Sequence, residues 1–379
     1  MMTAMRYFGY FLAGLLAMSA AGCGDGRGDP APDAGTTVLD PRFESCATAT
    51  TAAALKPAYV MFVLDGSGSM MDDNKWTVVQ PAMKSLFASF AQKADPTLAA
   101  GLIVFADSLD PTGSNMGIYG PYPQAGLDVP IGFVDSAAPF TARLSGMPKG
   151  LTPIQESLTG AYQALHAYQP SGKIKTGGRK LVVFMTDGFP FSSIPSEEQV
   201  TNSLAAAEAA TKDADPISTF AVGIGSFPAF DLVEYDPTFL GRLAVAGGTR
   251  RTSTCDPMEN ATVGNVCYYQ VTPSTMKPAA QLSDEFQAQL DEVRRQALAC
   301  EFELGAAPDG QQLNPAKLNI SYTDSKNMVH TIGQSATSGW SYDNPTDPKI
   351  IHLNGTACDD YRASGGKISI VLGCETIIL

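Results

Sequence analysis

Short apolar runs alternate with amphipathic stretches over residues 54–299. Runs such as AYVMFVL at 58–64 are apolar without a break, which is typical of a strand buried on both faces. Stretches such as 70–94 place apolar side chains three and four residues apart, as a helix with one buried face does. Because parallel strands need long crossovers, this alternation predicts an α/β fold: a doubly wound, mostly parallel sheet with helices on both faces. We expect strands at 58–64, 98–106, 179–187 and 216–225, an edge strand at 129–134, and helices at 70–94, 152–168, 196–212 and 278–299.

The pattern changes after Cys300 to short β-rich segments separated by turns. Trp340, Tyr342 and Tyr322 are large side chains that can supply a small core there. We therefore expect residues 300–379 to form a small β-rich region, separate from an α/β domain over residues 54–299.

Residues 1–22 have the pattern of an export signal, with one positive charge, a short apolar stretch and small residues at its end. The sequence AAGC, which ends at Cys23, resembles the lipobox of bacterial lipoproteins, although Ala20 stands where Leu is usual. Cys23 would then be diacylated, and ordinary cleavage nearby is the alternative. Residues 23–53 are expected to be the lipidated cysteine and a flexible linker rich in Gly, Pro and Asp. These features predict an exported lipoprotein anchored in the bacterial envelope, at the outer membrane or cell surface rather than the inner membrane.

The cysteine count supports export, because an even number in an exported chain indicates disulfides. The six cysteines after Cys23 are Cys46, Cys255, Cys267, Cys300, Cys358 and Cys374. We expect Cys255–Cys267 and Cys358–Cys374, which leaves Cys46–Cys300 by elimination. None of the cysteines forms a CxxC motif, which argues against a zinc site or a redox dithiol.

Carboxylates and hydroxyls follow the predicted strands at the points where they end. The first strand runs into Asp65, and Ser67 and Ser69 follow at alternate positions with glycines between them. Thr152 stands at a predicted helix start, and Asp187 follows another strand in MTDGFP. Because the ligands of doubly wound sheets lie at the carboxyl ends of the strands, we expect these five side chains to meet. All five offer oxygen, which suits a hard divalent cation: Mg²⁺ first, then Mn²⁺ or Ca²⁺.

The predicted site has only two carboxylates, so a metal held mainly by hydroxyls keeps excess positive charge. Such a metal should recruit a Glu or Asp carboxylate from a protein partner. Turn chemistry alone explains the DGSGS segment, and Thr152 would also suit a helix N-cap. Turn chemistry does not explain why a hydroxyl and a carboxylate also occur at two other expected element ends, as Thr152 and Asp187 do.

The motif Asp65-x-Ser67-x-Ser69, followed by Thr152 and by Asp187 in TDG, resembles the metal-ion-dependent adhesion site of von Willebrand factor type A domains. The resemblance covers about residues 57–299. It implies that Ser67, Ser69 and Thr152 are hydroxyl ligands, and that Asp65 and Asp187 bind the metal largely through water. It also implies the α/β fold, and a role in adhesion or scaffolding rather than catalysis.

Composition narrows the remaining function classes. The net charge of −13 and the absence of a Lys/Arg run argue against a nucleic-acid partner. With only three histidines, a histidine base or a histidine-rich zinc site has few sources. A phosphatase of the haloacid-dehalogenase type would need a second Asp where Ser67 stands, so we expect a binding protein and not an enzyme. The alternative is an envelope scaffold in which the metal only stabilises the loops.

Overall fold

The computed structural model describes residues 40–379 except 53, 106–119, 191–193, 195, 226–235, 253, 260–264, 272–280, 282–283, 291–292, 294–299, 305–313, 325 and 365–366. The predicted signal peptide and the lipidation of Cys23 lie outside the described residues. Within them, no helix is both long enough and apolar enough to cross a membrane.

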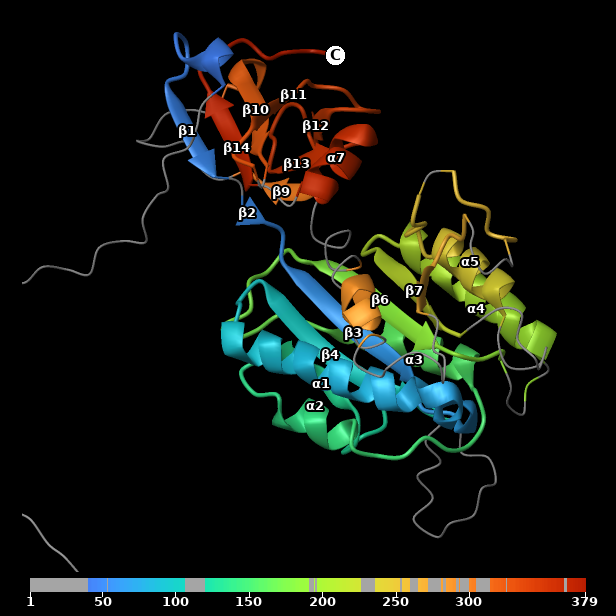
Figure 1. Ribbon diagram of the computed structural model, residues 1–379. Helices are drawn as coiled ribbons and strands as arrows, with labels where there is room; N and C mark the ends of the chain where they lie inside the picture. Colours follow the sequence, from blue (N-terminus) through green and yellow to red (C-terminus); the bar gives the residue numbers. More distant parts are fainter. Residues whose placement is uncertain are drawn as a thin grey trace, which may run out of the picture. The chain divides into compact units, whose positions relative to one another are not determined.

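A six-stranded sheet in the order β5-β4-β3-β6-β7-β8 forms the centre of the α/β domain (Figure 1). Its strands are β3 (Ala58–Asp65), β4 (Leu98–Phe105), β5 (Val129–Phe133), β6 (Arg179–Thr186), β7 (Ile217–Ile224) and β8 (Tyr269–Val271). All neighbouring strands pair in parallel except β5, which is an antiparallel edge strand. The predicted mostly parallel sheet is confirmed, including its edge strand, and β8 is an addition that the pattern did not predict.

Helices cover both faces of this sheet, as predicted (Figure 1). One face carries α1 (Lys75–Lys93) and α2 (Ala138–Arg143), and the other carries α3 (Ile154–Ala167), α4 (Ser196–Lys212) and α5 (Pro237–Ala246). The helix expected at 70–94 begins only at Lys75, because the 3-10 segment η2 (Gly68–Asn74) precedes it.

Strand β3 is buried along its whole length because its side chains serve both cores. Val60 and Phe62 belong to the core under α1, whereas Met61 and Val63 belong to the core under α3. Period-two alternation between two apolar layers requires a continuous apolar run, which is the pattern that predicted this strand. The strand therefore ends with Asp65 held rigidly between two packed layers.

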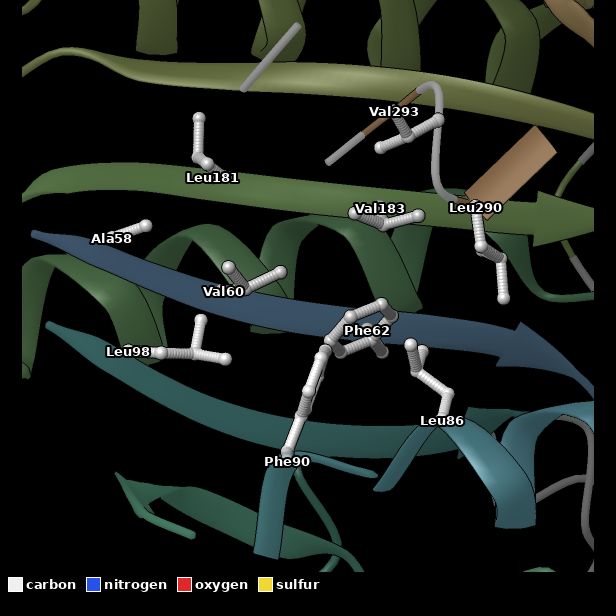
Figure 2. A pocket seen from close by; sticks show the side chains of 10 residues that line it. All are labelled: Ala58, Val60, Phe62, Leu86, Phe90, Leu98, Leu181, Val183, Leu290 and Val293. Atoms are coloured by element: carbon white, nitrogen blue, oxygen red, sulfur yellow. The ribbon is translucent and has the colours of Figure 1, made fainter. Parts of the chain in front are cut away.

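A small cavity of about 40 Å³ remains in the core under α1 (Figure 2). Side chains of β3, β4, β6 and α1 line it together with Leu290 and Val293, which lie in the described part of the last helix. The lining is apolar, so the cavity offers a water molecule no hydrogen-bond partner and is expected to be dry.

The remaining strands form a β domain of two four-stranded sheets, in the orders β1-β14-β10-β11 and β12-β13-β9-β2. Its elements are η1 (Pro41–Phe43), β1 (Ala49–Ala52), β2 (Ala54–Leu55), β9 (Glu301–Glu303), η4 (Pro315–Lys317), β10 (Leu318–Thr323), β11 (Val329–Ile332), β12 (Trp340–Tyr342), β13 (Ile350–Leu353), α7 (Thr356–Ser364) and β14 (Lys367–Leu372). One hydrophobic cluster, which includes Phe302, Ile320 and Trp340, joins side chains of both sheets.

The β domain is built from both ends of the chain, which differs from the expected boundaries. Residues 49–52 were expected in a flexible linker, but they form β1 and pair with β14 (Figure 1). Strand β2 pairs with β9 through Ala54↔Glu303 and Leu55↔Phe302. The α/β domain is therefore an insertion between two adjacent strands of the β domain. Pairing over such a separation leaves no local signal in the sequence.

The disulfides are Cys255–Cys267, Cys46–Cys374 and Cys300–Cys358. The first was predicted correctly. The predicted Cys358–Cys374 and Cys46–Cys300 pairs are wrong, because β1 pairs with β14 and brings Cys46 to Cys374. The carbonyl of Cys300 accepts a hydrogen bond from the amide of Leu353, which lies shortly before α7. Cys300 therefore lies near the start of α7 and forms its disulfide with Cys358 there.

We expect the double substitution Cys46→Ser and Cys374→Ser to destabilise the β domain by about 2–5 kcal/mol, because this bond closes a very long loop of the unfolded chain. Urea denaturation followed by tryptophan fluorescence measures the loss, in a Trp76→Phe background so that the signal comes from Trp340. Peptide mapping without reduction should recover Cys46 linked to Cys374. A Cys46–Cys300 peptide would contradict the observed pairing.

Candidate metal site

The candidate site is built on the loop that follows β3. The amide of Gly66 donates to the carbonyl of Phe105 at 2.9 Å, which continues the pairing of β3 with β4 past the end of the strand. A Cβ at Gly66 would lie 2.9 Å from Val104 Cγ1, so only glycine permits this approach. Two further backbone hydrogen bonds, Lys149 to Gly66 at 2.8 Å and Gly68 to Gly150 at 3.2 Å, bind the loop to the segment that leads to Thr152.

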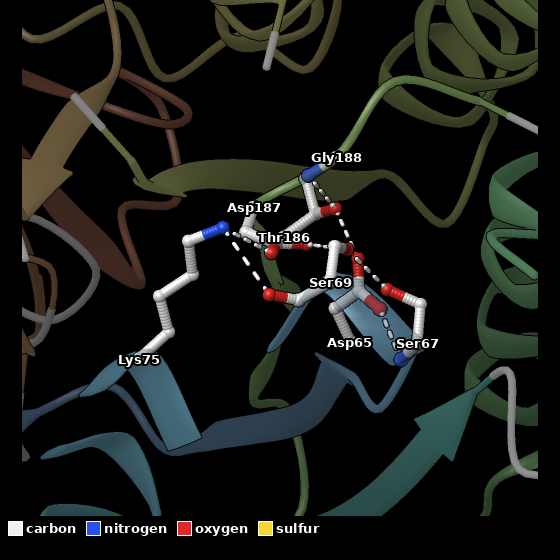
Figure 3. Close-up of polar contacts among 7 residues, drawn as sticks. All are labelled: Asp65, Ser67, Ser69, Lys75, Thr186, Asp187 and Gly188. Carbon is white, nitrogen blue, oxygen red and sulfur yellow. Dashed lines mark hydrogen bonds and ion pairs between the residues drawn. The ribbon is translucent and has the colours of Figure 1, made fainter. Parts of the chain in front are cut away.

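A chain of hydrogen bonds joins four of the five predicted residues (Figure 3). The Ser67 amide donates to Asp65 Oδ1 at 2.7 Å, and the hydroxyls of Ser67 and Ser69 are hydrogen-bonded at 3.0 Å. The Ser69 hydroxyl then donates to Asp187 Oδ1 at 2.9 Å. Residues far apart in the sequence therefore meet at the carboxyl edge of β3 and β6, as the strand-end argument predicted.

Thr152, the fifth predicted residue, lies beside Gly188. A Cβ placed on Gly188 would be 3.6 Å from Thr152 Oγ1 and 3.6 Å from Asp65 Oδ2. Glycine at this position thus keeps open a space that the hydroxyl and the carboxylate both border. Helix α3 begins at Ile154 with Pro153 as its N-cap, so Thr152 does not cap the helix, which was the competing interpretation.

Two residues that the sequence analysis missed complete the network. The Thr186 hydroxyl donates to Asp65 Oδ2 at 2.5 Å and accepts from the Gly188 amide at 3.0 Å. Lys75 Nζ donates to Asp187 Oδ2 at 2.7 Å. The sequence offered no signal for Lys75, because the helix predicted at 70–94 places it beyond the first turn. Only the observed start of α1 at Lys75 puts its charge where it opposes the helix dipole.

The charges of the site are not balanced. Asp65 and Asp187 are both fully buried, and among the described residues Lys75 forms an ion pair with Asp187 only. Burial, followed by the charge of Asp187, raises the pKa of Asp65 to about 7. Burial also raises the pKa of Asp187, although the Lys75 charge opposes this shift. An additional cation would favour the ionised form of both carboxylates, so this arrangement is what a cation site requires.

The oxygen chemistry of the site fits a hard divalent cation. In the part of the chain that the structure describes, no three His, Cys, Asp or Glu side chains gather as metal ligands. A cation at this edge would therefore depend on the hydroxyls of Ser67, Ser69 and Thr152 beside the two carboxylates.

Residues 60–189 match the family model of the von Willebrand factor type A domain. This segment of the α/β domain is therefore similar to a von Willebrand factor type A domain. The matched segment includes all five predicted site residues. No curated protein matches the chain.

Several solved structures are similar to the chain at low identity. They include the pilus adhesin SpaC from Lactobacillus rhamnosus GG in its open conformation, with 14% identity, a TM-score of 0.44, and coverage of 85% of this chain and 39% of SpaC. The proximal thread matrix protein 1 from the mussel byssus, with a zinc-occupied MIDAS motif, has 17% identity, a TM-score of 0.37, and coverage of 64% and 49%. The type V pili tip protein Mfa5 domain from Porphyromonas gingivalis has 14% identity, a TM-score of 0.32, and coverage of 63% and 96%. The chain thus spans well under half of SpaC.

We expect Thr186→Val to destabilise the α/β domain by about 1–3 kcal/mol, because it leaves the buried Gly188 amide and one Asp65 oxygen without their partner. Urea denaturation measures the change. Thr201→Val is the matched control, since Thr201 is exposed on α4, and it should shift stability by less than about 0.5 kcal/mol. Equal effects of the two substitutions would contradict a structural role for the Thr186 hydroxyl.

We also expect the protein in a chelating buffer to lose stability as the pH rises from about 4 to about 7. The pKa of Asp65 is about 7 in the folded protein against an ordinary value of 3.8, so folding takes up a proton between these values. The stabilisation from the Asp65 carboxyl is complete at a pH below its ordinary pKa of 3.8. It disappears as the pH rises through its pKa in the folded protein, which is about 7. Chemical denaturation across this range measures the slope, which Asp65→Asn should reduce. If the dependence of stability on pH is unchanged in Asp65→Asn, it does not come from the Asp65 carboxyl.

Proposed function

We propose that the type A domain binds a divalent cation through Asp65, Ser67, Ser69, Thr152 and Asp187, and that the bound cation binds a carboxylate of a partner protein. The observation that carries the proposal is the chain of hydrogen bonds from Asp65 to Asp187, which gathers two buried carboxylates and two hydroxyls against one ammonium group. Mg²⁺ is the first candidate because all the ligands are neutral or anionic oxygens, and Mn²⁺ and Ca²⁺ come next.

The exposure of the site residues supports an interaction from outside. Asp65, Ser67 and Asp187 are buried, whereas Ser69 is partly exposed and marks the open side. Met71, two residues further along, is 47% exposed and offers an apolar contact next to that opening. A cation held by few charges keeps positive charge toward this side, so an acidic side chain is the complementary ligand.

The setting that we propose is the bacterial envelope. Three disulfides indicate an oxidising compartment, which supports export by the signal peptide proposed at residues 1–22. Lipidation of Cys23 would then anchor the protein to a membrane, and the type A domain would present its site to a partner. The alternative function is a scaffold in which the cation only stabilises the loops. We propose no catalytic role.

We expect Mg²⁺ or Mn²⁺ to raise the melting temperature of the protein relative to a chelating buffer, since binding to the folded state alone stabilises it. Ser67→Ala should abolish this shift. Ser157→Ala is the matched control, because Ser157 is an equally buried serine on α3 and donates only to the Ile154 carbonyl. Calorimetric titration measures the affinity, and an unchanged affinity in Ser67→Ala would contradict the proposed ligand set.

The partner step is tested by capture from an envelope extract with wild type and Asp65→Ala, in Mg²⁺ and in a chelator. The adhesive function predicts capture only by wild type in Mg²⁺. A synthetic Glu peptide should compete with the captured protein, and its Gln counterpart should not. Capture that persists in Asp65→Ala, with a lowered melting temperature, would favour the scaffold function.

A further inference from the structure

The lysine in the site is placed as a counter-ion and not as a surface charge. The side chain of Lys75 is only 8% exposed, and its partner Asp187 is fully buried. Besides the 2.7 Å bond to Asp187 Oδ2, its ammonium donates to the Ser69 carbonyl at 3.3 Å. Both groups belong to the cluster that includes the proposed metal ligands, so the ammonium is held inside the site (Figure 3).

The backbone bends to bring this lysine to the site. Asp73 and Asn74, the last two residues of η2, adopt left-handed conformations, with φ of 48° and 63°, directly before the first residue of α1. Such conformations cost energy for residues other than glycine, although Asp and Asn tolerate them best. They start α1 at Lys75 and direct its side chain back toward Asp187 (Figure 3). The helix dipole also disfavours a cation there, so the ion pair with Asp187 offsets two local costs.

We propose that Lys75 is a tethered cation that stabilises the metal-free site by occupying Asp187 and so limits the affinity for divalent cations; this inference rests on the proposed cation site. Of the two oxygens of Asp187, Oδ1 accepts from Ser69 and Oδ2 accepts from Lys75. A divalent cation that uses Asp187, directly or through water, must share the carboxylate with an ammonium group or displace it. Like charges in a buried site repel strongly, so the divalent cation binds against the lysine.

With this role of Lys75, the site differs from one whose loops fold only when a metal is bound. Without Lys75, two buried carboxylates would face each other with no cation among the described residues, and the loops would need a metal to stay in place. With Lys75, the loops are held in both states. The metal then serves the interaction with a partner and not the integrity of the fold.

The test compares wild type with Lys75→Met, which keeps the length of the side chain and removes its charge. In a chelating buffer, Lys75→Met should melt several degrees below wild type, because Asp187 loses its counter-ion. In a calorimetric titration with Mg²⁺ or Mn²⁺, Lys75→Met should bind roughly ten-fold tighter or more, since the repulsion is gone. Lys180→Met is the matched control: Lys180 is equally buried and pairs with the exposed Asp215, so its loss should leave the affinity unchanged.

A second variant covers the case in which Lys75→Met does not fold without metal. The double substitution Lys75→Met with Asp187→Asn removes both charges, and it should restore melting in the chelating buffer toward that of wild type. Equal or weaker cation binding by Lys75→Met, while wild type binds, would overturn this inference and leave the proposed cation site intact. Tight binding by Lys75→Met with none by wild type would support the inference and overturn the proposed function. No binding by either would overturn both.

Discussion

The burial of two carboxylates at the carboxyl edge of a parallel sheet is the constraint on which this structure depends. Asp65 is the last residue of β3 and Asp187 directly follows the adjacent strand β6, and both side chains are fully buried. Isolated buried charges are costly, so the surrounding groups must compensate them. The Thr186 hydroxyl, the Ser67 amide, the Ser69 hydroxyl and the Lys75 ammonium all donate to these carboxylates. The shape of the loops follows from this requirement.

The same constraint connects stability with the proposed function. A site with two carboxylates and one ammonium group is short of positive charge, and burial raises the pKa of both acids. A divalent cation would remove the deficit and leave positive charge for a partner's carboxylate. The tethered lysine reduces the deficit without removing it. The proposed cation site would for this reason be compatible with a fold that does not need metal.

The β domain connects the two ends of the inserted α/β domain. These ends continue into strands β2 and β9, which pair with each other. Two disulfides then connect segments of the β domain that are remote in sequence. The strands that flank the insertion therefore belong to a domain that is cross-linked by covalent bonds.

Periodicity and local chemistry determined much of this protein from sequence alone. The continuous apolar run of β3 and the stripes of α1 identified the α/β fold, because both patterns reflect burial and depend only on nearby residues. The order of Asp65, Ser67, Ser69, Thr152 and Asp187 identified the candidate site, since parallel strands bring their carboxyl ends to one edge.

Tertiary structure alone decided the features that depend on distant partners. The pairing of β1 with β14 set two disulfides and moved a supposed linker into a sheet, and a strand of four residues carries no mark of its partner hundreds of residues away. Thr186 and Lys75 belong to the site only because of hydrogen bonds that close in three dimensions. A threonine and a lysine have many possible roles in a sequence, and the buried carboxylates beside them select one.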